Sequence, residues 1–123
     1  MRAQGRASVG WLRPGVLEVV FAGHVTGQVV DEVHRLTRDL LGEEATLRAV
    51  VFETTLVSGF DADVANPGRH LLSYLKSLGA TRSVAVTPRA AVRMIGSAIS
   101  LGSGIKMEFF GSRRDAQPAI DKL

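Results

Sequence analysis

The sequence predicts a single α/β domain, with a mixed and mostly parallel sheet of five strands and about four helices in the order ββαβαβαβα. Short segments rich in Val, Ala and Phe alternate with helical patterns of roughly ten to fifteen residues, which is typical of parallel strands joined by right-handed crossovers. Pro14 and Gly15 separate the first two apolar segments and predict a hairpin, which adds one antiparallel strand. The chain has 123 residues, 46% of them hydrophobic and 22% charged, so it can bury a core of its own.

Local patterns place each element. Residues 16–25 are β-branched and almost continuously apolar, so we expect a central strand there. The other strands are expected at residues 9–12, 47–53, 83–86 and 105–110. Helices are expected near residues 26–41, 67–78 and 88–101, with a short one after Ser112. One domain therefore occupies residues 1–123, with residues 1–7 expected to form a flexible tail.

Composition excludes several classes of protein. The chain has no cysteine, which excludes disulfides, thiolate zinc sites and cysteine nucleophiles and suits a reducing cytoplasm. No apolar run approaches the ~20 residues that cross a bilayer. The net charge of +3 suggests nucleic acid, but aromatic residues are only 6% and the longest basic run is Arg113-Arg114. We therefore expect no nucleic-acid partner and no membrane span.

The sequence also lacks the usual signatures of catalysis and metal binding. Ser58 is not part of a Gly-x-Ser-x-Gly elbow, so nothing completes a nucleophile, a base and an orienting group. His24, His34 and His70 lie on different predicted elements, without the spacing of paired metal ligands. We therefore expect a protein that is not an enzyme and has no catalytic residue, metal or cofactor.

An irregular segment follows the third predicted strand, at residues 54–63. It lies past the carboxyl end of a central parallel strand, where open α/β sheets place their ligand sites. The segment is rich in hydroxyl groups and includes two apolar residues without periodicity, Val57 and Phe60. Two interpretations stay open: a packed loop with Phe60 buried, or a functional surface. The residues that we expect to form a partner-binding loop are Thr54, Thr55, Ser58, Gly59, Phe60, Asp61 and Asp63.

Three short stretches indicate a family. They are Ala22-Gly23-His24-Val25-Thr26, the strand Ala49-Val50-Val51-Phe52-Glu53, and Arg82-Ser83-Val84-Ala85-Val86-Thr87-Pro88. With the predicted element order, they resemble the STAS domain, the family of bacterial anti-sigma-factor antagonists and their relatives. The similarity extends from about Val16 to Ala116, and Gly59-Phe60-Asp61 looks like divergent antagonist-like members. The resemblance implies a STAS-like fold and a cytoplasmic signalling role in bacteria.

The chain departs from this family at the regulatory motif. Family antagonists carry Asp-Ser-Ser-Gly at the start of the helix after the third strand, and a partner kinase phosphorylates one serine. Aligning Asp61 with the motif's aspartate places Asp63 where that serine would be, at the start of the second helix. Aligning Ser58 and Gly59 instead keeps a serine but loses the aspartate. Phosphorylation control therefore depends on which register holds.

Two functions remain from different classes. The first is a regulatory module that binds a protein of a kinase or sigma-factor pathway, through residues 54–63 and the second and third helices. The second is a STAS-like or CRAL-TRIO-like module for a small ligand or lipid. The sequence favours the first, because a core accounts for the apolar residues without a cavity. The third helix has a wide apolar arc with Met94 and Leu101 at its edge, which predicts a homodimer or partner interface there.

Overall fold

The computed structural model describes residues 4–42 and 46–123. The strands in these residues are β1 (Arg6–Arg13), β2 (Val16–Val25), β3 (Ala49–Phe60), β4 (Arg82–Val86) and β5 (Lys106–Phe110). The helices are α1 (Gly27–Leu41), α2 (Ala65–Ser77), α3 (Ala90–Ser100) and α4 (Arg113–Asp121), with a 3-10 turn at Ala62–Val64. The predicted order ββαβαβαβα is confirmed.

A five-stranded sheet organises the fold, with its strands in the spatial order β1-β2-β3-β4-β5. β1 pairs with β2 antiparallel, and the other three pairings are parallel, so the predicted mixed sheet is confirmed. The hairpin turns at Gly15, whose φ of 81° lies in the left-handed region that favours glycine. Each parallel connection contains one helix, which is the βαβ arrangement that the alternating pattern predicts.

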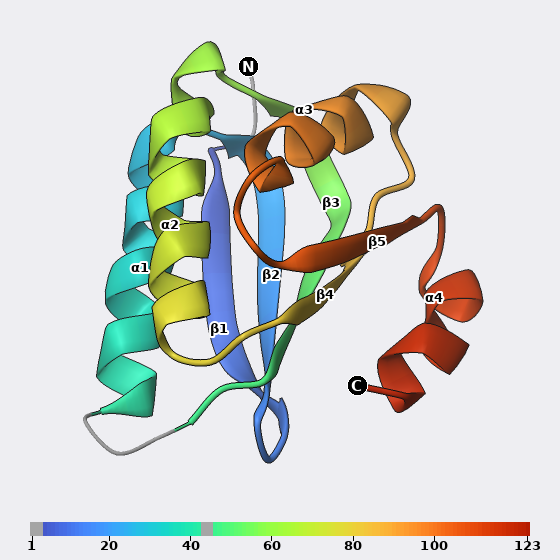
Figure 1. Cartoon of the computed structure of the whole chain (residues 1–123). Coiled ribbons are helices and arrows are strands. Elements are labelled where there is room, and N and C mark those ends of the chain that lie inside the picture. Colours follow the sequence, from blue (N-terminus) through green and yellow to red (C-terminus); the bar gives the residue numbers. More distant parts are fainter. Residues whose placement is uncertain (1–3, 43–45) are drawn as a thin grey trace.

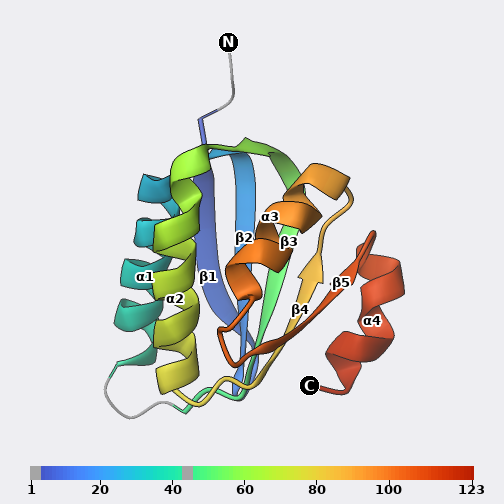
Figure 2. The same cartoon turned by 45° about the horizontal axis from the view of Figure 1, so that its top comes forward.

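The helices cover the two faces of the sheet unequally (Figures 1 and 2). α1, α2 and α3 lie on one face, over a core that includes Leu17, Val50 and Leu75. α4 lies on the opposite face, where Ala116 and Ile120 are fully buried against a second core of strand residues. In the part of the chain that the structure describes, no helix is long and apolar enough to cross a membrane.

α1 and α2 lie side by side on the first face. Thr26 caps α1 by accepting a hydrogen bond from the backbone N–H of Val29, and Gly42 follows the helix end with a φ of 63°. The ring of His34 on α1 stacks on that of Tyr74 on α2, with 4.3 Å between their centroids. Burial lowers the pKa of His34; nearby Arg38 and His70 lower it further, whereas Asp31 raises it.

Several boundaries differ from those predicted. β1 begins at Arg6 and Gln4 pairs with His24, so residues 4–7 are not a tail, and residues 1–3 lie outside the described residues. α2 begins at Ala65 because the 3-10 turn leads directly into it, and Pro67 is tolerated in a first turn whose N–H groups have no intrahelical partner. α3 begins at Ala90 rather than at residue 88.

Candidate functional site

The prediction of an irregular loop at residues 54–63 is wrong for residues 54–60, because β3 continues to Phe60. Between Val20 and Ala22 of β2, the register on β3 jumps from Glu53 to Leu56, and a second shift follows between Gly23 and His24. Each shift inserts one extra residue into β3, as in a β-bulge. Bulges break the alternation of inward and outward side chains, which is why this strand has no visible period in the sequence.

The hydroxyl-bearing residues of this extension have separate surroundings. Thr54 is buried, and its Oγ1 donates a hydrogen bond to the carbonyl of Val86 at 2.6 Å. Thr55 is exposed, and its Oγ1 lies 2.7 Å from a carboxylate oxygen of Glu53. Ser58 is exposed, and its carbonyl accepts a hydrogen bond from the guanidinium of Arg89 at 2.8 Å. The last contact joins the end of β3 to the residue that precedes α3.

Gly59, Phe60 and Asp61 connect this strand end to β2. The Phe60 ring packs edge-on against Phe21, with 6.3 Å between centroids, so it is part of the core and only partly exposed. The Asp61 carboxylate pairs with Nε2 of His24, and a Cβ at Gly59 would lie 3.4 Å from the same imidazole. The packed interpretation of Phe60 therefore fits the structure.

Asp63 lies at a different helix from the one expected. Its Oδ1 accepts a hydrogen bond from the backbone N–H of Gly27 at 3.0 Å, so the carboxylate faces the first turn of α1 rather than that of α2. The backbones of Gly27 and Asp63 approach each other closely, since a Cβ at Gly27 would lie only 2.9 Å from the Asp63 carbonyl oxygen. The expectation of an Asp63 charge at the start of α2 is wrong, since the 3-10 turn directs this side chain across to α1.

α3 leaves much of its apolar surface exposed. In this 11-residue helix only Val92 is buried. Met94 is 72% exposed and Leu101, which follows the helix, is 82% exposed. Together with exposed Ala91 and Ala98 they recur at intervals of three and four residues, which places them along one side. We call Ala91, Met94, Ala98 and Leu101 the α3 stripe.

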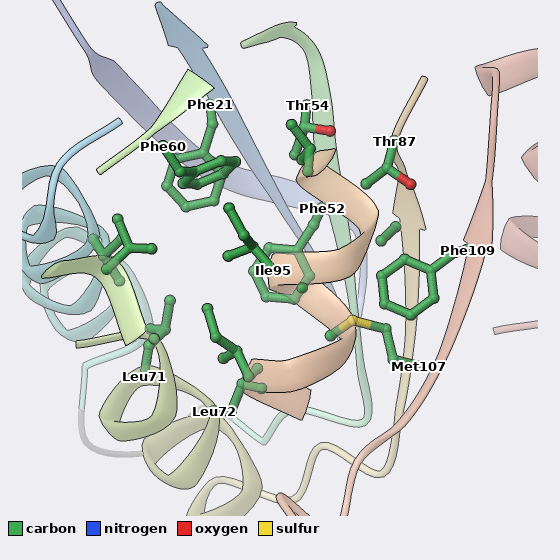
Figure 3. Close-up of a pocket in the computed structure, with 17 residues that line it drawn as sticks. Phe21, Phe52, Thr54, Phe60, Leu71, Leu72, Thr87, Ile95, Met107 and Phe109 are labelled. Carbon is green, nitrogen blue, oxygen red and sulfur yellow. The ribbon is translucent and has the colours of Figure 1, made fainter. Parts of the chain in front are cut away.

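An apolar cavity of about 90 Å³ lies between α3, α2 and the sheet. Figure 3 shows Phe21 and Phe60 together at one end and Met107 and Phe109 at the other, with Phe52 and Ile95 between them. Two threonines, Thr54 and Thr87, also line it. The expectation that a core without a cavity accounts for the apolar residues is wrong. No pattern in the sequence could have revealed the space, because it depends on how closely α3 approaches β4 and β5.

Two further features bear on chemistry. Among the described residues, no group of three or more His, Asp and Glu side chains could hold a metal ion. The Thr87 hydroxyl is buried without a hydrogen-bond partner among the same residues, although its backbone N–H donates to the carbonyl of Phe110 at 2.7 Å. The site therefore consists of a packed strand end, an apolar cavity and an exposed helix.

Solved structures resemble the whole described fold. No family model and no curated protein matches the chain in sequence. An uncharacterized DUF3478-family protein with a SpoIIAA-like fold from Shewanella loihica PV-4 has a TM-score of 0.70 at 16% identity, over 95% of each chain. The unphosphorylated anti-sigma factor antagonist SpoIIAA has a TM-score of 0.65 at 12% identity, over 95% of this chain and 97% of its own. The phosphorylated form of SpoIIAA, described as a Bacillus cell fate determinant, has a TM-score of 0.64 at 11% identity, over 93% and 98%. The chain therefore has the SpoIIAA-like fold, as its resemblance to STAS domains predicted.

Proposed function

We propose that this protein is a non-catalytic regulatory module that binds another protein through the α3 stripe and the adjoining end of β3. The exposure of Met94 and Leu101 carries the proposal, because large apolar side chains grouped on one side of a helix are typical of docking surfaces. The inner side of α3 holds it to the core through Val92, Ile95 and Ile99. The outer side of α3, which carries the α3 stripe, is not needed for core packing and is available to bind a partner.

The SpoIIAA-like fold gives the proposal its biological context. SpoIIAA is an anti-sigma factor antagonist. By analogy of fold, we place the partner in a kinase or sigma-factor pathway of the bacterial cytoplasm. Arg89 supports a joint surface, because its contact with the Ser58 carbonyl holds the exposed end of β3 next to the start of α3.

Control by phosphorylation has two versions in this chain. Asp63 lies between β3 and α2, where the first register places the phosphoserine, but its carboxylate already accepts a hydrogen bond from α1. A residue fixed in that way gives a permanent state rather than a switch. Ser58 is exposed and is the acceptor of the second version. Mass spectrometry of the native protein separates them, since stoichiometric phosphate on Ser58 would exclude a permanently fixed state.

A capture experiment tests the proposed interface. Wild-type protein and the Met94→Glu/Leu101→Glu variant are immobilised and exposed to lysate of the source cell, and retained proteins are identified by mass spectrometry. We expect a partner that the variant loses and that a matched control, Leu40→Glu on α1, retains, since Leu40 is also exposed. Equal retention by all three proteins would place the interface elsewhere. Light scattering in the same buffers tests the alternative that a second copy of this chain covers the α3 stripe in a homodimer.

A second candidate function, binding of a small apolar ligand, is favoured by the cavity beneath α3. Its volume of about 90 Å³ is below the ~150 Å³ of an engineered cavity that binds benzene, so a lipid would fit only if α3 moved outward. Native mass spectrometry of the purified protein decides between the two functions. A retained apolar molecule supports this candidate, and apo protein supports the first.

A further inference from the structure

The charges of this chain are distributed very unevenly. Residues 64–107 contain six of its 15 Lys and Arg residues and none of its 12 Asp and Glu residues. This segment forms all of α2, β4 and α3, and the turn into β5. The whole chain is only weakly basic, with a net charge of +3, because its acidic residues gather elsewhere.

Most cations of this segment have no acidic partner within the described part of the chain. Arg82 pairs with Glu108 at 3.5 Å, whereas the five exposed cations Arg69, Lys76, Arg89, Arg93 and Lys106 form no ion pair there. Outside this segment, two arginines are paired with acidic residues in the described part of the chain. Arg35 pairs with Glu32 and Asp39 on α1, and Arg113 with Glu18 and Glu53 on the opposite face of the sheet.

One of these cations lines a groove, and a second lies on the same side of α2. Arg69, Ser73 and Lys76 recur at four and three residues along α2, so they share one side of the helix. Arg69 and Ser73 line a groove of about 130 Å³ whose other wall includes Ile99, Leu101 and Ser103. Lys76 extends the same wall, since a Cβ at Gly104 would lie 3.2 Å from its side chain. Figure 1 shows the C-terminal end of α3 and the following turn directed toward α2.

The dimensions of this groove suit a short segment of polypeptide. Arg69 and Lys76 are two turns apart, or about 10 Å along the axis of α2. Acidic residues at positions i and i+3 of an extended segment, or i and i+7 of a helix, have about the same spacing. Leu101 lines the same groove as Arg69 and is exposed, so it offers an apolar contact to the same segment.

We propose that the groove between α2 and the α3–β5 turn binds an acidic segment of a protein partner, with carboxylates at Arg69 and Lys76 and an apolar side chain at Leu101. The proposal rests on the proposed function and specifies the chemistry of the partner. A concave wall between two elements fits a polypeptide better than a flat lipid surface. Aromatic side chains that would stack on nucleic acid bases are absent from the residues that line the groove.

A peptide selection tests this proposal without a known partner. A random dodecapeptide library displayed on phage is panned on wild-type protein, with Arg69→Glu/Lys76→Glu as the counter-selection. We expect the recovered peptides to be enriched in Asp and Glu and to include an apolar residue. A synthetic peptide from the selection should bind the double variant at least about tenfold more weakly than wild type, and more weakly as salt rises.

The control is Arg114→Glu, which reverses an exposed cation on α4, on the opposite face. It should bind the peptide as wild type does, which separates a local site from an effect of net charge. The proposal is overturned if selected peptides lack acidic enrichment, if Arg114→Glu weakens binding equally, or if no peptide is recovered. It is also overturned if phosphatidylserine vesicles or a single-stranded oligonucleotide bind more tightly than the peptide and lose binding in the double variant. A captured partner that needs Met94 and Leu101 but not Arg69 and Lys76 would leave the proposed function intact and remove only this inference.

Discussion

Replacing Asp63 tests whether its carboxylate has a structural role at α1. Asp63→Ala removes the acceptor for the Gly27 N–H, an interaction that contributes roughly 0.5–1.5 kcal/mol when replaced by water. The charge at the helix N-terminus contributes roughly another 0.3–1 kcal/mol. Because Asp63 is exposed, we expect the lower part of this range, a loss of about 1 kcal/mol. Asp63→Asn keeps the acceptor and loses the charge, so it should cost less than half as much.

Urea unfolding followed by circular dichroism measures both variants. The midpoint should fall in the order wild type, Asp63→Asn, Asp63→Ala, with an unchanged slope, and the melting temperature of Asp63→Ala should fall by about 4 °C. Asp31→Ala, an exposed acidic residue on the same helix, is the control and should unfold close to wild type. Identical midpoints for all four proteins would refute the structural role. Asp63 would then be free to act as a substitute for a phosphoserine.

Three other substitutions test the cavity, the buried hydroxyl and the pH dependence of stability. Ala85→Val adds two methyl groups to the cavity wall on β4 and should stabilise the protein by about 1 kcal/mol in urea unfolding; destabilisation would mean that the space is filled. Thr87→Val removes a buried hydroxyl that has no partner in the described residues and should also raise stability, by up to about 1 kcal/mol, whereas a loss would reveal a bound water. The pKa of His34 is lowered in the folded state, so the unfolded chain binds a proton at this residue more readily. The folded state therefore keeps its full stability above about pH 6.5 and loses part of it as the pH falls below that value. Wild type should therefore lose more stability than His34→Gln between neutral pH and pH 5, and equal losses would count against this role of His34.

The architecture could be predicted because each element has its own local signal. The continuous apolarity of β2 reflects burial on both faces of the sheet, with Val16 and Leu17 belonging to different cores. The turn at Gly15 and the cap at Thr26 depend on nearest neighbours in the chain. Such features require no knowledge of what lies across the fold.

The candidate site could be predicted only in outline. The exposed edge of α3 was visible as an apolar arc wider than one sheet face needs, and Met94 and Leu101 are exposed as expected. The contact of Asp63 with Gly27 joins residues that are 36 positions apart, so only the path of the chain brings them together. The bulges of β3 likewise depend on pairing with β2, and without that pairing residues 54–60 have the appearance of a loop.

The charge distribution, unlike the Asp63 contact, is visible in the sequence, but net charge and the length of basic runs do not reveal it. Both α2 and α3 carry cations and no Asp or Glu residue. Like charges on neighbouring elements repel, and salt screens this repulsion over a Debye length of about 8 Å at physiological ionic strength. Added salt should therefore leave folding stability unchanged or slightly raise it, while it weakens binding of an acidic partner. Stability and binding that fell together with added salt would instead indicate that the cations of α2 and α3 are engaged in ion pairs that hold the fold.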